Sequence, residues 1–530
     1  MNRALVSGSF VLLGFGGFTL VALVALISAA DGGPLGLPID RLASPYALRI
    51  LGFTLSQAFL SVGLSILGAI PLALIVIRYR RFMGRDWIIR LLALPLALPP
   101  LVAVIGLLQV WGRSGTVSDL LQFLGLDMRL SIFGMGGVVL AHVFFNLPLA
   151  ARLMITHLER QPDTVFRLAD QLGLSGWSRV RLLEAPLLLP HLPAVAGLVL
   201  MLCIGSFTIV LTLGGGPASA TYEVAIYQAL RFDFDPGLAA VFTLAQLVLA
   251  TTILLVLHRF GGAPDDRAGT SSRPQMGGEN LPRSVLALLG VYGLLLLAPL
   301  VALAAAGVGA EWERLVLLPR LWSATITSLV IAACSACLSV TGAYLLAVGR
   351  DRGLAPRGVA RGLYMAGYAS VGSAVLAIPP IILGAGWFIL LRGAAHQTAL
   401  AAVMVIIVNA LMALPFVLRV LAPAHQAAMR RYGSLCAGLG LVGWRRFVLI
   451  DAPVLARPFA AACAFALVLS VGDLGAAAIF GAYDLVTLPI LILNLMGSYR
   501  TTDAAGVALA LALFVFALIW LADRINRISL

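Results

Sequence analysis

The sequence predicts an all-α integral membrane protein with about twelve transmembrane helices in two pseudo-symmetric halves of six. Three observations predict this class. First, 61% of the 530 residues are hydrophobic and 11% are charged, whereas a soluble globular domain has about 25% charged residues. Second, apolar stretches of about 20 residues, the length that a helix needs to cross a bilayer, recur along the chain. Third, one polar segment occurs twice, which indicates a duplicated half.

The repeated segment covers residues 167–186 in the first half and residues 434–453 in the second. Gly173 and Gly440 occupy the same place in the two copies, 267 positions apart (440 − 173). A glycine inside a polar stretch between apolar spans predicts two short helices separated by a turn. The same spacing relates Trp177 to Trp444, Pro186 to Pro453, Pro148 to Pro415, Arg152 to Arg419 and Arg179 to Arg446.

Six apolar spans are predicted in the first half, at about residues 7–30, 51–77, 88–111, 131–155, 193–213 and 238–257. The first is longer than the apolar core of about 7–15 residues in a signal peptide, so we expect a retained span. The second ends on Arg78-Tyr79-Arg80-Arg81, a basic stretch typical of a cytoplasmic boundary. The third is interrupted by Pro95 and Pro99-Pro100, and the fifth runs into Gly214-Gly215-Gly216-Pro217, where a helix cannot easily continue.

The second half repeats this plan, with spans at about residues 286–306, 324–348, 363–391, 399–421, 459–480 and 504–521. In each half the last span follows a stretch rich in carboxylates and aromatic rings, residues 221–236 and 481–503, which we expect to be outer loops. The predicted organisation is therefore a first half (1–258) with its polar loop at about 156–192, a flexible polar linker (259–283), and a second half (284–530) with its polar loop at about 422–457.

The arginines predict the orientation of the spans. All 36 basic side chains are arginines, and nine fall in the loops on one side, which leaves 27 (36 − 9) on the other side or at its boundary. Because cytoplasmic loops carry the excess of basic residues, both termini and both polar loops are predicted to be cytoplasmic. The nine arginines assigned to the outer side are Arg41, Arg49, Arg113, Arg129, Arg231, Arg314, Arg320, Arg392 and Arg500.

Several classes of function are excluded by what the sequence lacks. The chain contains no lysine, so it has no P-loop and cannot hydrolyse ATP in that way. The arginines are scattered among loops, which disfavours nucleic-acid binding. The histidines show no metal-ligand spacing, so no metal site is predicted. Cys334 and Cys337 have the spacing of a redox motif but lie within a span, where we interpret them as small packing residues. The remaining function is passage across the membrane, powered by a partner or by an ion gradient.

One carboxylate falls inside a predicted span. Asp473 follows Gly472 in the eleventh span, and a charge within a span is costly and commonly faces a cavity. Its counterpart in the first half is Ser206, 267 positions earlier (473 − 206), and Phe207 follows it. These four residues are the predicted substrate pathway. The alternative is that Asp473 lies near the membrane surface and serves only as an anchor or an ion-pair partner.

The two polar loops resemble the "EAA" loops of ABC importer permeases, and we call them the first and second coupling loops. Each keeps the family's glycine and downstream proline, although Arg167-Leu168-Ala169 and Ser434-Leu435-Cys436 stand where the family has Glu-Ala-Ala. The resemblance implies a coupling helix that sits in a groove of a separate ATP-hydrolysing subunit. Ordinary connecting loops with a turn glycine are the alternative. The residues expected to make this contact are Arg167, Leu168, Ala169, Gly173, Leu435, Cys436 and Gly440.

Further segments resemble thiamine-importer permeases, whose relatives include ferric-iron importer permeases. They are residues 141–148, 213–217, 225–230, 232–236 and 497–500. Carboxylates beside aromatic rings suit a thiazolium cation through cation–π contact, whereas carboxylates with tyrosines also suit Fe(III). Interface anchoring is the commoner role of such aromatic residues. The residues expected to contact substrate or a binding protein on the outer face are Glu223, Tyr227, Asp233 and Asp235.

The resemblance implies a type I ABC importer permease in the bacterial inner membrane, without an ATPase site or cofactor of its own. ATP and Mg²⁺ would be bound by two copies of a partner ATPase subunit, and a periplasmic substrate-binding protein would deliver thiamine or its phosphates. A ferric-iron importer permease is the alternative substrate assignment. A secondary transporter driven by an ion gradient is the alternative class, but it predicts a network of intramembrane carboxylates, and Asp473 is the one candidate. A structural membrane scaffold leaves the matched loops unexplained.

Overall fold

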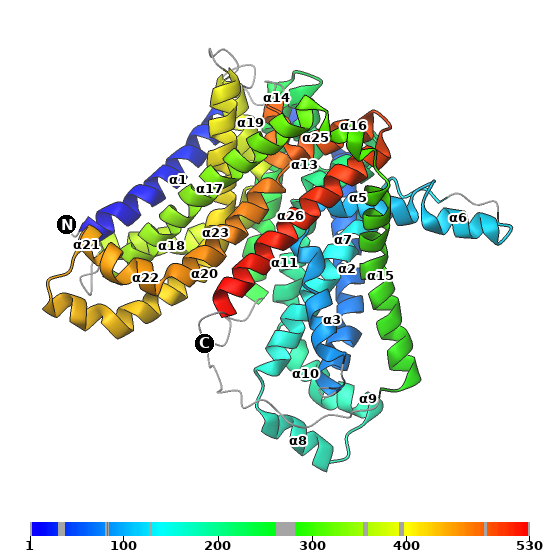
Figure 1. The fold of residues 1–530 in the computed structure, drawn as a ribbon, viewed down its shortest axis with the longest axis horizontal. Helices are drawn as coiled ribbons and strands as arrows, with labels where there is room; N and C mark the ends of the chain where they lie inside the picture. Colours follow the sequence, from blue (N-terminus) through cyan, green and yellow to red (C-terminus); the bar gives the residue numbers. More distant parts are fainter. Residues whose placement is uncertain are drawn as a thin grey trace. The chain divides into compact units, whose positions relative to one another are not determined.

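A computed structural model describes residues 3–29, 38–79, 82, 84–126, 130–260, 281–352, 359–391, 397–481 and 485–527. Every secondary-structure element within these residues is helical (Figure 1), which confirms the predicted all-α class. Most of the predicted linker (residues 261–280) lies outside the described residues, and so do Arg80 and Arg81 of the basic stretch after the second span.

The first half of the chain forms fourteen α-helices and three short helical turns within the described residues. They are α1 (Arg3–Ser28), η1 (Ile39–Ala43), α2 (Pro45–Arg78), α3 (Arg85–Leu91), α4 (Leu94–Ala97), α5 (Pro100–Trp111), α6 (Thr116–Phe123), α7 (Met135–Glu159), α8 (Asp163–Gln171), α9 (Gly176–Arg179), η2 (Val180–Glu184), α10 (Ala185–Leu188), α11 (Leu192–Ile204), α12 (Phe207–Leu213), η3 (Pro217–Ser219), α13 (Tyr222–Arg231) and α14 (Pro236–Phe260).

The second half repeats much of this order. Its elements are α15 (Arg283–Val308), α16 (Trp312–Val316), α17 (Pro319–Arg352), α18 (Val359–Ala377), α19 (Pro380–Leu391), α20 (Gln397–Gly438), α21 (Gly443–Arg446), η4 (Phe447–Asp451), α22 (Ala452–Val454), α23 (Ala456–Val471), α24 (Gly475–Phe480), α25 (Leu488–Gly497) and α26 (Thr501–Arg527). The duplication is clearest in α2 and α17, which are both 34 residues long and both begin with proline. Proline suits a first helical position because its missing N–H has no partner there in any case.

Nine helices in the described residues are long and apolar enough to cross a membrane, and two bent helix pairs raise the number to as many as eleven. The protein is therefore a multi-pass membrane protein, close to the predicted twelve spans. The span predicted at residues 363–391 is divided into α18 and α19 at Pro379-Pro380. Proline cannot donate a backbone hydrogen bond and restricts the residue before it, so the helix stops there.

Two spans that were predicted to be continuous are broken. Residues 193–213 divide into α11 and α12 at Gly205-Ser206, and residues 459–480 divide into α23 and α24 around Gly472-Asp473. In the second break the carboxylate of Asp473 accepts hydrogen bonds from the backbone N–H groups of Gly475 and Ala476, both at 3.2 Å. A side chain that satisfies the first N–H groups of α24 stabilises a new helix start.

The two stretches predicted to be outer loops are also partly helical, so the expectation of loop structure was wrong. Residues 221–236 contain α13, and residues 481–503 contain α25. Both helices are ten residues long, and each lies directly before the last long helix of its half. Buried residues of α13 include Val224, Ala225 and Ile226, which shows that packing against the remainder of the protein stabilises this short helix.

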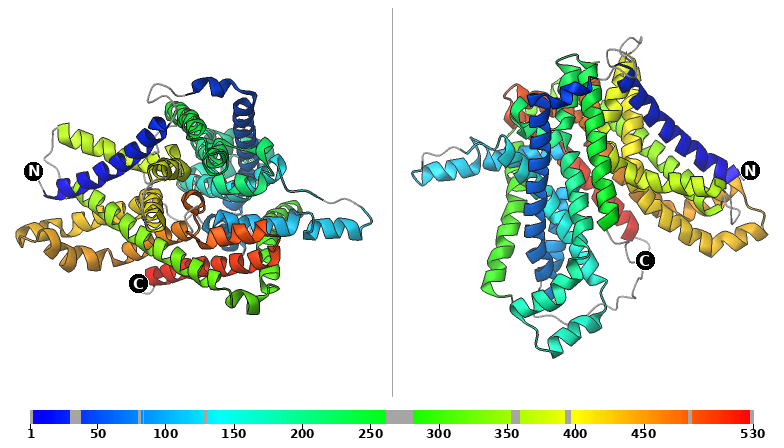
Figure 2. Two further views of the ribbon diagram at one scale, coloured as in Figure 1. Left: turned by 90° about the horizontal axis from the view of Figure 1, so that it is seen from above. Right: turned by 180° about the vertical axis from the view of Figure 1, so that it is seen from behind.

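The chain divides into two compact units whose bounds differ from those of the sequence halves. Unit 1 contains Met1–Ala43, Glu223–Leu244 and Gly307–Leu530, and unit 2 contains Ser44–Tyr222 and Ala245–Ala306. The first long helix of each half therefore packs with helices of the other half. In unit 1, α1 lies along α17 and α19 (Figure 2). In unit 2, α15 reaches α2, where the Tyr292 hydroxyl donates to the carbonyl of Gly68 at 2.6 Å.

Small residues permit the close helix contacts within each unit. A Cβ on Gly386 of α19 would lie 2.1 Å from the carbonyl oxygen of Ala22 in α1. A Cβ on Gly106 of α5 would lie 2.5 Å from the carbonyl oxygen of Pro299 in α15. Glycine is therefore required at both positions, because any side chain would separate the two backbones.

Candidate functional site

The first coupling loop turns at Gly173. Helix α8 ends just before this glycine, whose φ is +68°. The N–H of Leu174 donates to the carbonyl of Ala169 at 3.0 Å, which closes the helix end in the way that a left-handed glycine allows. The second loop repeats this geometry: Gly440 has a φ of +62°, and the N–H of Leu441 donates to the carbonyl of Cys436 at 2.9 Å.

Backbone conformation, and not steric crowding, explains why glycine occupies positions 173 and 440. A Cβ built on Gly173 or Gly440 has no atom of the described residues within 4 Å. Each loop has a second left-handed glycine three residues later, Gly176 with a φ of +52° and Gly443 with a φ of +58°. Left-handed φ values are unfavourable for most other residues, so the turn depends on both glycines.

The helices before the two turns differ. In the first loop α8 has nine residues and is separated from α7 by Pro162. In the second loop the turn follows α20, which continues for 42 residues. The prediction of two short helices is therefore wrong for the second copy. Met429 occupies the position that matches Pro162, and methionine lets the helix continue.

The two loops present matching apolar side chains to their surroundings. Trp177 is 76% exposed and Trp444 is 75% exposed. Exposed leucines accompany them at matching positions, namely Leu168 and Leu172 in the first loop and Leu435 and Leu439 in the second. Exposed apolar side chains that gather on a polar loop mark an interaction surface.

The predicted coupling residues divide into exposed and buried groups. The exposed ones are Arg167, Leu168, Gly173, Leu435 and Gly440. Ala169 and Cys436 are buried, and their carbonyls accept the hydrogen bonds that close the helix ends. These two residues therefore position the turn, while their neighbours form its outer surface.

Each coupling loop also contains a buried carboxylate that was not among the predicted site residues. Glu184 is 2% exposed and ends the π-helical turn η2, and Asp451 is 0% exposed and ends the π-helical turn η4. Buried carboxylates are uncommon without a partner, and a π-helical turn often lies at a functional position. The signal was present in the sequence, because an acidic residue precedes Ala-Pro in both copies at the same spacing of 267 (451 − 184).

Ser206 of the predicted pathway belongs to a polar cluster in unit 2. Its hydroxyl lies 2.6 Å from Nε2 of His142, and Nδ1 of the same ring lies 3.1 Å from the hydroxyl of Ser61. Asn146, one turn beyond His142, donates to the sulfur of Cys203 at 3.3 Å. The cluster joins α2 and α7 to the break between α11 and α12. Ser206 itself is partly exposed, whereas Phe207 is buried.

The matching break in unit 1 contains Asp473. This residue is partly exposed, while Gly472 beside it is buried. Asn409, which matches His142 at the same spacing (409 − 142), donates to the hydroxyl of Ser470 at 2.9 Å. Asp473 thus has a structural role as the cap of α24, and its predicted contact with substrate stays a prediction.

The four predicted outer-face residues lie in different environments within unit 1. Glu223 and Tyr227 are buried on α13, so they do not form part of an exposed loop. The Asp235 carboxylate accepts a hydrogen bond from the N–H of Leu238 at 2.9 Å, which caps the start of α14. It also pairs with Arg41 at 2.5 Å. Asp233 is exposed.

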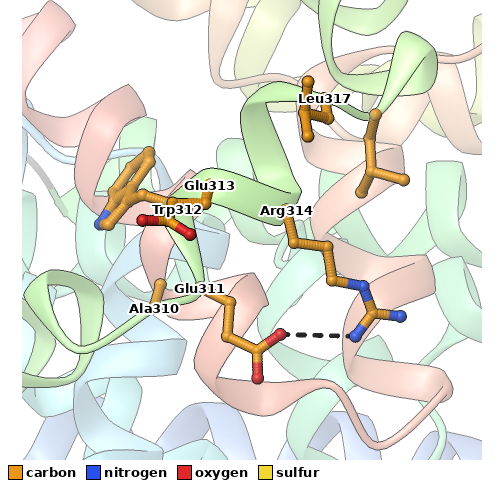
Figure 3. A pocket seen from close by; sticks show the side chains of 7 residues that line it. Ala310, Glu311, Trp312, Glu313, Arg314 and Leu317 are labelled. Carbon is orange, nitrogen blue, oxygen red and sulfur yellow. Dashed lines mark hydrogen bonds and ion pairs between the residues drawn. The ribbon is translucent and has the colours of Figure 1, made fainter.

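An open pocket of about 750 Å³ lies over α16 in unit 1, and it was not predicted. Glu311 and Arg314 form an ion pair of 3.5 Å at its edge, and Trp312 and Glu313 lie near it (Figure 3). The indole of Trp312 donates to the carbonyl of Gly307 at 3.0 Å, which fixes the ring. Within unit 1, α16 and α25 lie at the end opposite α21 and α22 (Figure 1).

Comparison with known proteins places this chain in a family. Residues 65–261, which include the first coupling loop, match the family model of the binding-protein-dependent transport system inner membrane component. The thiamine transport system permease protein of Brucella abortus (strain 2308) is 43% identical over 509 residues, which cover 95% of this chain and 92% of the relative.

Two further relatives carry the same name. The permease protein of Escherichia coli (strain K12) is 40% identical over 520 residues, covering 95% of this chain and 94% of the relative. That of Haemophilus influenzae is 36% identical over 535 residues, covering 96% and 94%. Similarity of this extent covers both sequence halves, both coupling loops and both broken spans. The chain therefore belongs to the family of thiamine transport system permease proteins, which are binding-protein-dependent inner membrane components.

Proposed function

We propose that this chain is the membrane-spanning subunit of an ATP-driven importer that moves thiamine from the periplasm to the cytoplasm. The observation that carries the proposal is the similarity to thiamine transport permeases over 95% of the chain. The substrate is assigned through those relatives. The two coupling loops support the assignment of ATP hydrolysis by a partner subunit as the energy source.

The coupling loops are the proposed docking sites for a separate ATPase. Two loops with the same glycine turn and the same exposed tryptophan suit two copies of one partner, one for each half of the sequence. ATP and Mg²⁺ would be bound by that partner, since this chain contains no lysine for a P-loop. Closure of the ATPase pair would displace both loops and open the protein outward, and hydrolysis would reverse the change.

The orientation follows from the same assignment. Docking of an ATPase requires the coupling loops to be cytoplasmic. The excess of arginines on the side of these loops agrees with that orientation, which places both termini in the cytoplasm as well. In unit 1 the α16 pocket and the turn before α26 are then on the periplasmic side, because they lie opposite α21 and α22. A periplasmic binding protein would dock on that side, in keeping with the binding-protein dependence of the matched family.

The breaks in the eleventh span and its first-half counterpart are the proposed pathway elements. Ser206 and Asp473 are partly exposed at positions where a helix is interrupted. Thiamine carries a positively charged thiazolium ring, and a carboxylate in a region of low dielectric constant would stabilise its passage. The asymmetry between serine and aspartate means that one half would supply the charge.

Co-purification with activity tests this function. The chain is purified from membranes under conditions that keep associated subunits bound. A bound ATPase is then identified by its nucleotide hydrolysis. Labelled thiamine uptake is then measured in vesicles that contain the complex, with unlabelled thiamine, its phosphates and ferric iron as competitors. The proposal expects an associated ATPase and uptake that only thiamine or its phosphates compete for. Competition by ferric iron and not by thiamine would contradict the substrate assignment.

A further inference from the structure

The buried carboxylates Glu184 and Asp451 lie where each coupling loop enters the membrane-spanning part of its unit. Each follows a short helix of the loop and is the last residue of a π-helical turn, and each precedes Ala-Pro. Directly beyond them the chain bends by 64° in the first loop and by 80° in the second before the next span. A displacement of the loop must therefore pass through this elbow or through side chains that bridge it.

In the first loop, Glu184 is held by two arginines. Nε of Arg78, the last residue of α2, donates to Oε1 at 2.6 Å, and a terminal nitrogen of the same guanidinium contacts Oε2. Arg179, at the end of α9, approaches Oε1 at 3.5 Å. Arg179 also pairs with Asp170 of α8 at 2.5 Å. A continuous ionic path thus joins α8 to α2 through Arg179, Glu184 and Arg78.

The contact between Arg78 and Glu184 is geometrically demanding. A guanidinium that meets both oxygens of a carboxylate fixes orientation as well as distance, which a single ammonium or amide cannot do. Because Glu184 is buried, its charge needs these partners to remain in place. The pair is therefore suited to transmit a displacement from the loop to α2.

In the second loop, Asp451 is held in a different way. The Tyr344 hydroxyl of α17 donates to Oδ2 at 2.7 Å, and Nε of Arg446 approaches Oδ1 at 3.5 Å. The Tyr344 ring packs edge-on against Phe447 of η4 at 5.3 Å and against Phe459 of α23 at 5.6 Å. Here α17 is joined to the loop by aromatic packing as well as by the hydroxyl.

We propose that Glu184 and Asp451 are positioning residues for coupling, which connect movement of each coupling loop to α2 in unit 2 and to α17 in unit 1. This inference rests on the proposed function, since it assumes that an ATPase displaces the loops. The two connections are unequal. The first depends on one bidentate ion pair, whereas the second keeps its ring contacts when the hydroxyl is removed.

The test measures a coupling ratio, the amount of thiamine transported per ATP hydrolysed, in the complex of this chain with its ATPase and binding protein. Glu184→Gln removes the charge and keeps the shape. We expect the ATPase to remain bound and its activity to stay within twofold of wild type, while thiamine uptake falls at least tenfold. Asp86→Asn is the matched control, because Asp86 of α3 pairs with Arg85 at 82% side-chain exposure and lies outside both coupling loops. It should leave the ratio unchanged.

The following results would overturn the inference. If uptake and ATP hydrolysis fall in proportion, or the ATPase no longer binds, Glu184 stabilises the fold or the docking surface and does not position the loop. If Glu184→Gln behaves like Asp86→Asn, the ion pair has no part in coupling. If Glu184→Gln does not reach the membrane, Arg78→Lys is tested in its place, because lysine keeps the positive charge and loses the bidentate geometry. An unchanged coupling ratio in Arg78→Lys overturns the inference as well.

The unequal connections give a second comparison. Tyr344→Phe keeps the ring contacts, so its coupling ratio should stay within twofold of wild type, whereas Arg78→Met should reduce the ratio as strongly as Glu184→Gln. A larger loss in Tyr344→Phe than in Arg78→Met would contradict the proposed difference between the two loops. A wild-type complex without an ATPase would instead refute the proposed function, which is a separate outcome.

Discussion

Replacing Gly173 and Gly440 together by leucine should abolish thiamine uptake while the protein still inserts into the membrane. Both glycines have left-handed φ values, +68° and +62°. An L-residue in that conformation costs about 1–2 kcal/mol. A difference of about 1.4 kcal/mol changes an equilibrium tenfold, so each turn is weakened locally, yet the cost is small beside the packing of a multi-span protein.

The added side chains would not collide with the described part of the chain. A Cβ at either position has no atom of the described residues within 4 Å, so a leucine there extends into the surroundings, beside the exposed Leu172 or Leu439. If those surroundings are the ATPase surface, the leucines obstruct docking or shift the loop. Asparagine is the matched control for the backbone, because it tolerates left-handed φ values better than leucine.

The assay compares membrane abundance, ATPase co-purification and thiamine uptake for the two double variants. We expect wild-type abundance in both, no uptake in the leucine variant, and partial uptake in the asparagine variant. Wild-type uptake in the leucine variant would show that no partner approaches these turns, and the assignment of the coupling loops would then be wrong.

Two further predictions concern other parts of the protein. Asp473→Asn should strongly lower thiamine uptake and leave ATPase binding and basal hydrolysis intact, because loss of a helix cap costs only about 1 kcal/mol. Reduced abundance with loss of both activities would instead indicate that Asp473 only caps α24. Replacing Trp177 and Trp444 together by alanine should reduce ATPase co-purification severalfold without changing abundance, as measured by the ratio of the two subunits after purification; an unchanged ratio with altered membrane insertion would identify the rings as membrane-interface anchors.

Much of the fold could be predicted because its signals are local or repeated. The positions of the long helices follow from apolar stretches, and the breaks at Pro99-Pro100 and at Gly173 follow from the conformational limits of proline and glycine. The matched spacing of the two loops was visible without any structure. It also located the turns, whose φ values the structure then provided.

The errors arose where local polar contacts or contacts between distant helices decide the outcome. Apolar content averaged over 20 residues does not reveal that Asp473 starts a new helix by accepting from Gly475 and Ala476. Residues 221–236, rich in carboxylates and rings, were expected to be a loop, yet they contain α13 and Glu223 is buried. The packing of α15 beside α2 depends on partners more than 200 residues apart in sequence, such as Tyr292 and Gly68.

The candidate site could be predicted only in part, because some of its residues have a sequence signature and others do not. Gly173 and Gly440 have a sequence signature, and the structure places both at exposed turns. Glu184 and Asp451 were overlooked although an acidic residue precedes Ala-Pro in both copies, because the sequence does not show that Arg78 and Tyr344, from distant helices, reach these carboxylates.

The most direct test of the central claim is thiamine uptake by sealed vesicles that contain this chain, its ATPase and its binding protein. ATP is enclosed on the ATPase side, and ionophores collapse the proton and sodium gradients. We predict that uptake continues without the gradients and stops when ATP is replaced by a non-hydrolysable analogue. Uptake that stops with the ionophores while ATP is held constant would contradict an ATP-driven importer and indicate a secondary transporter.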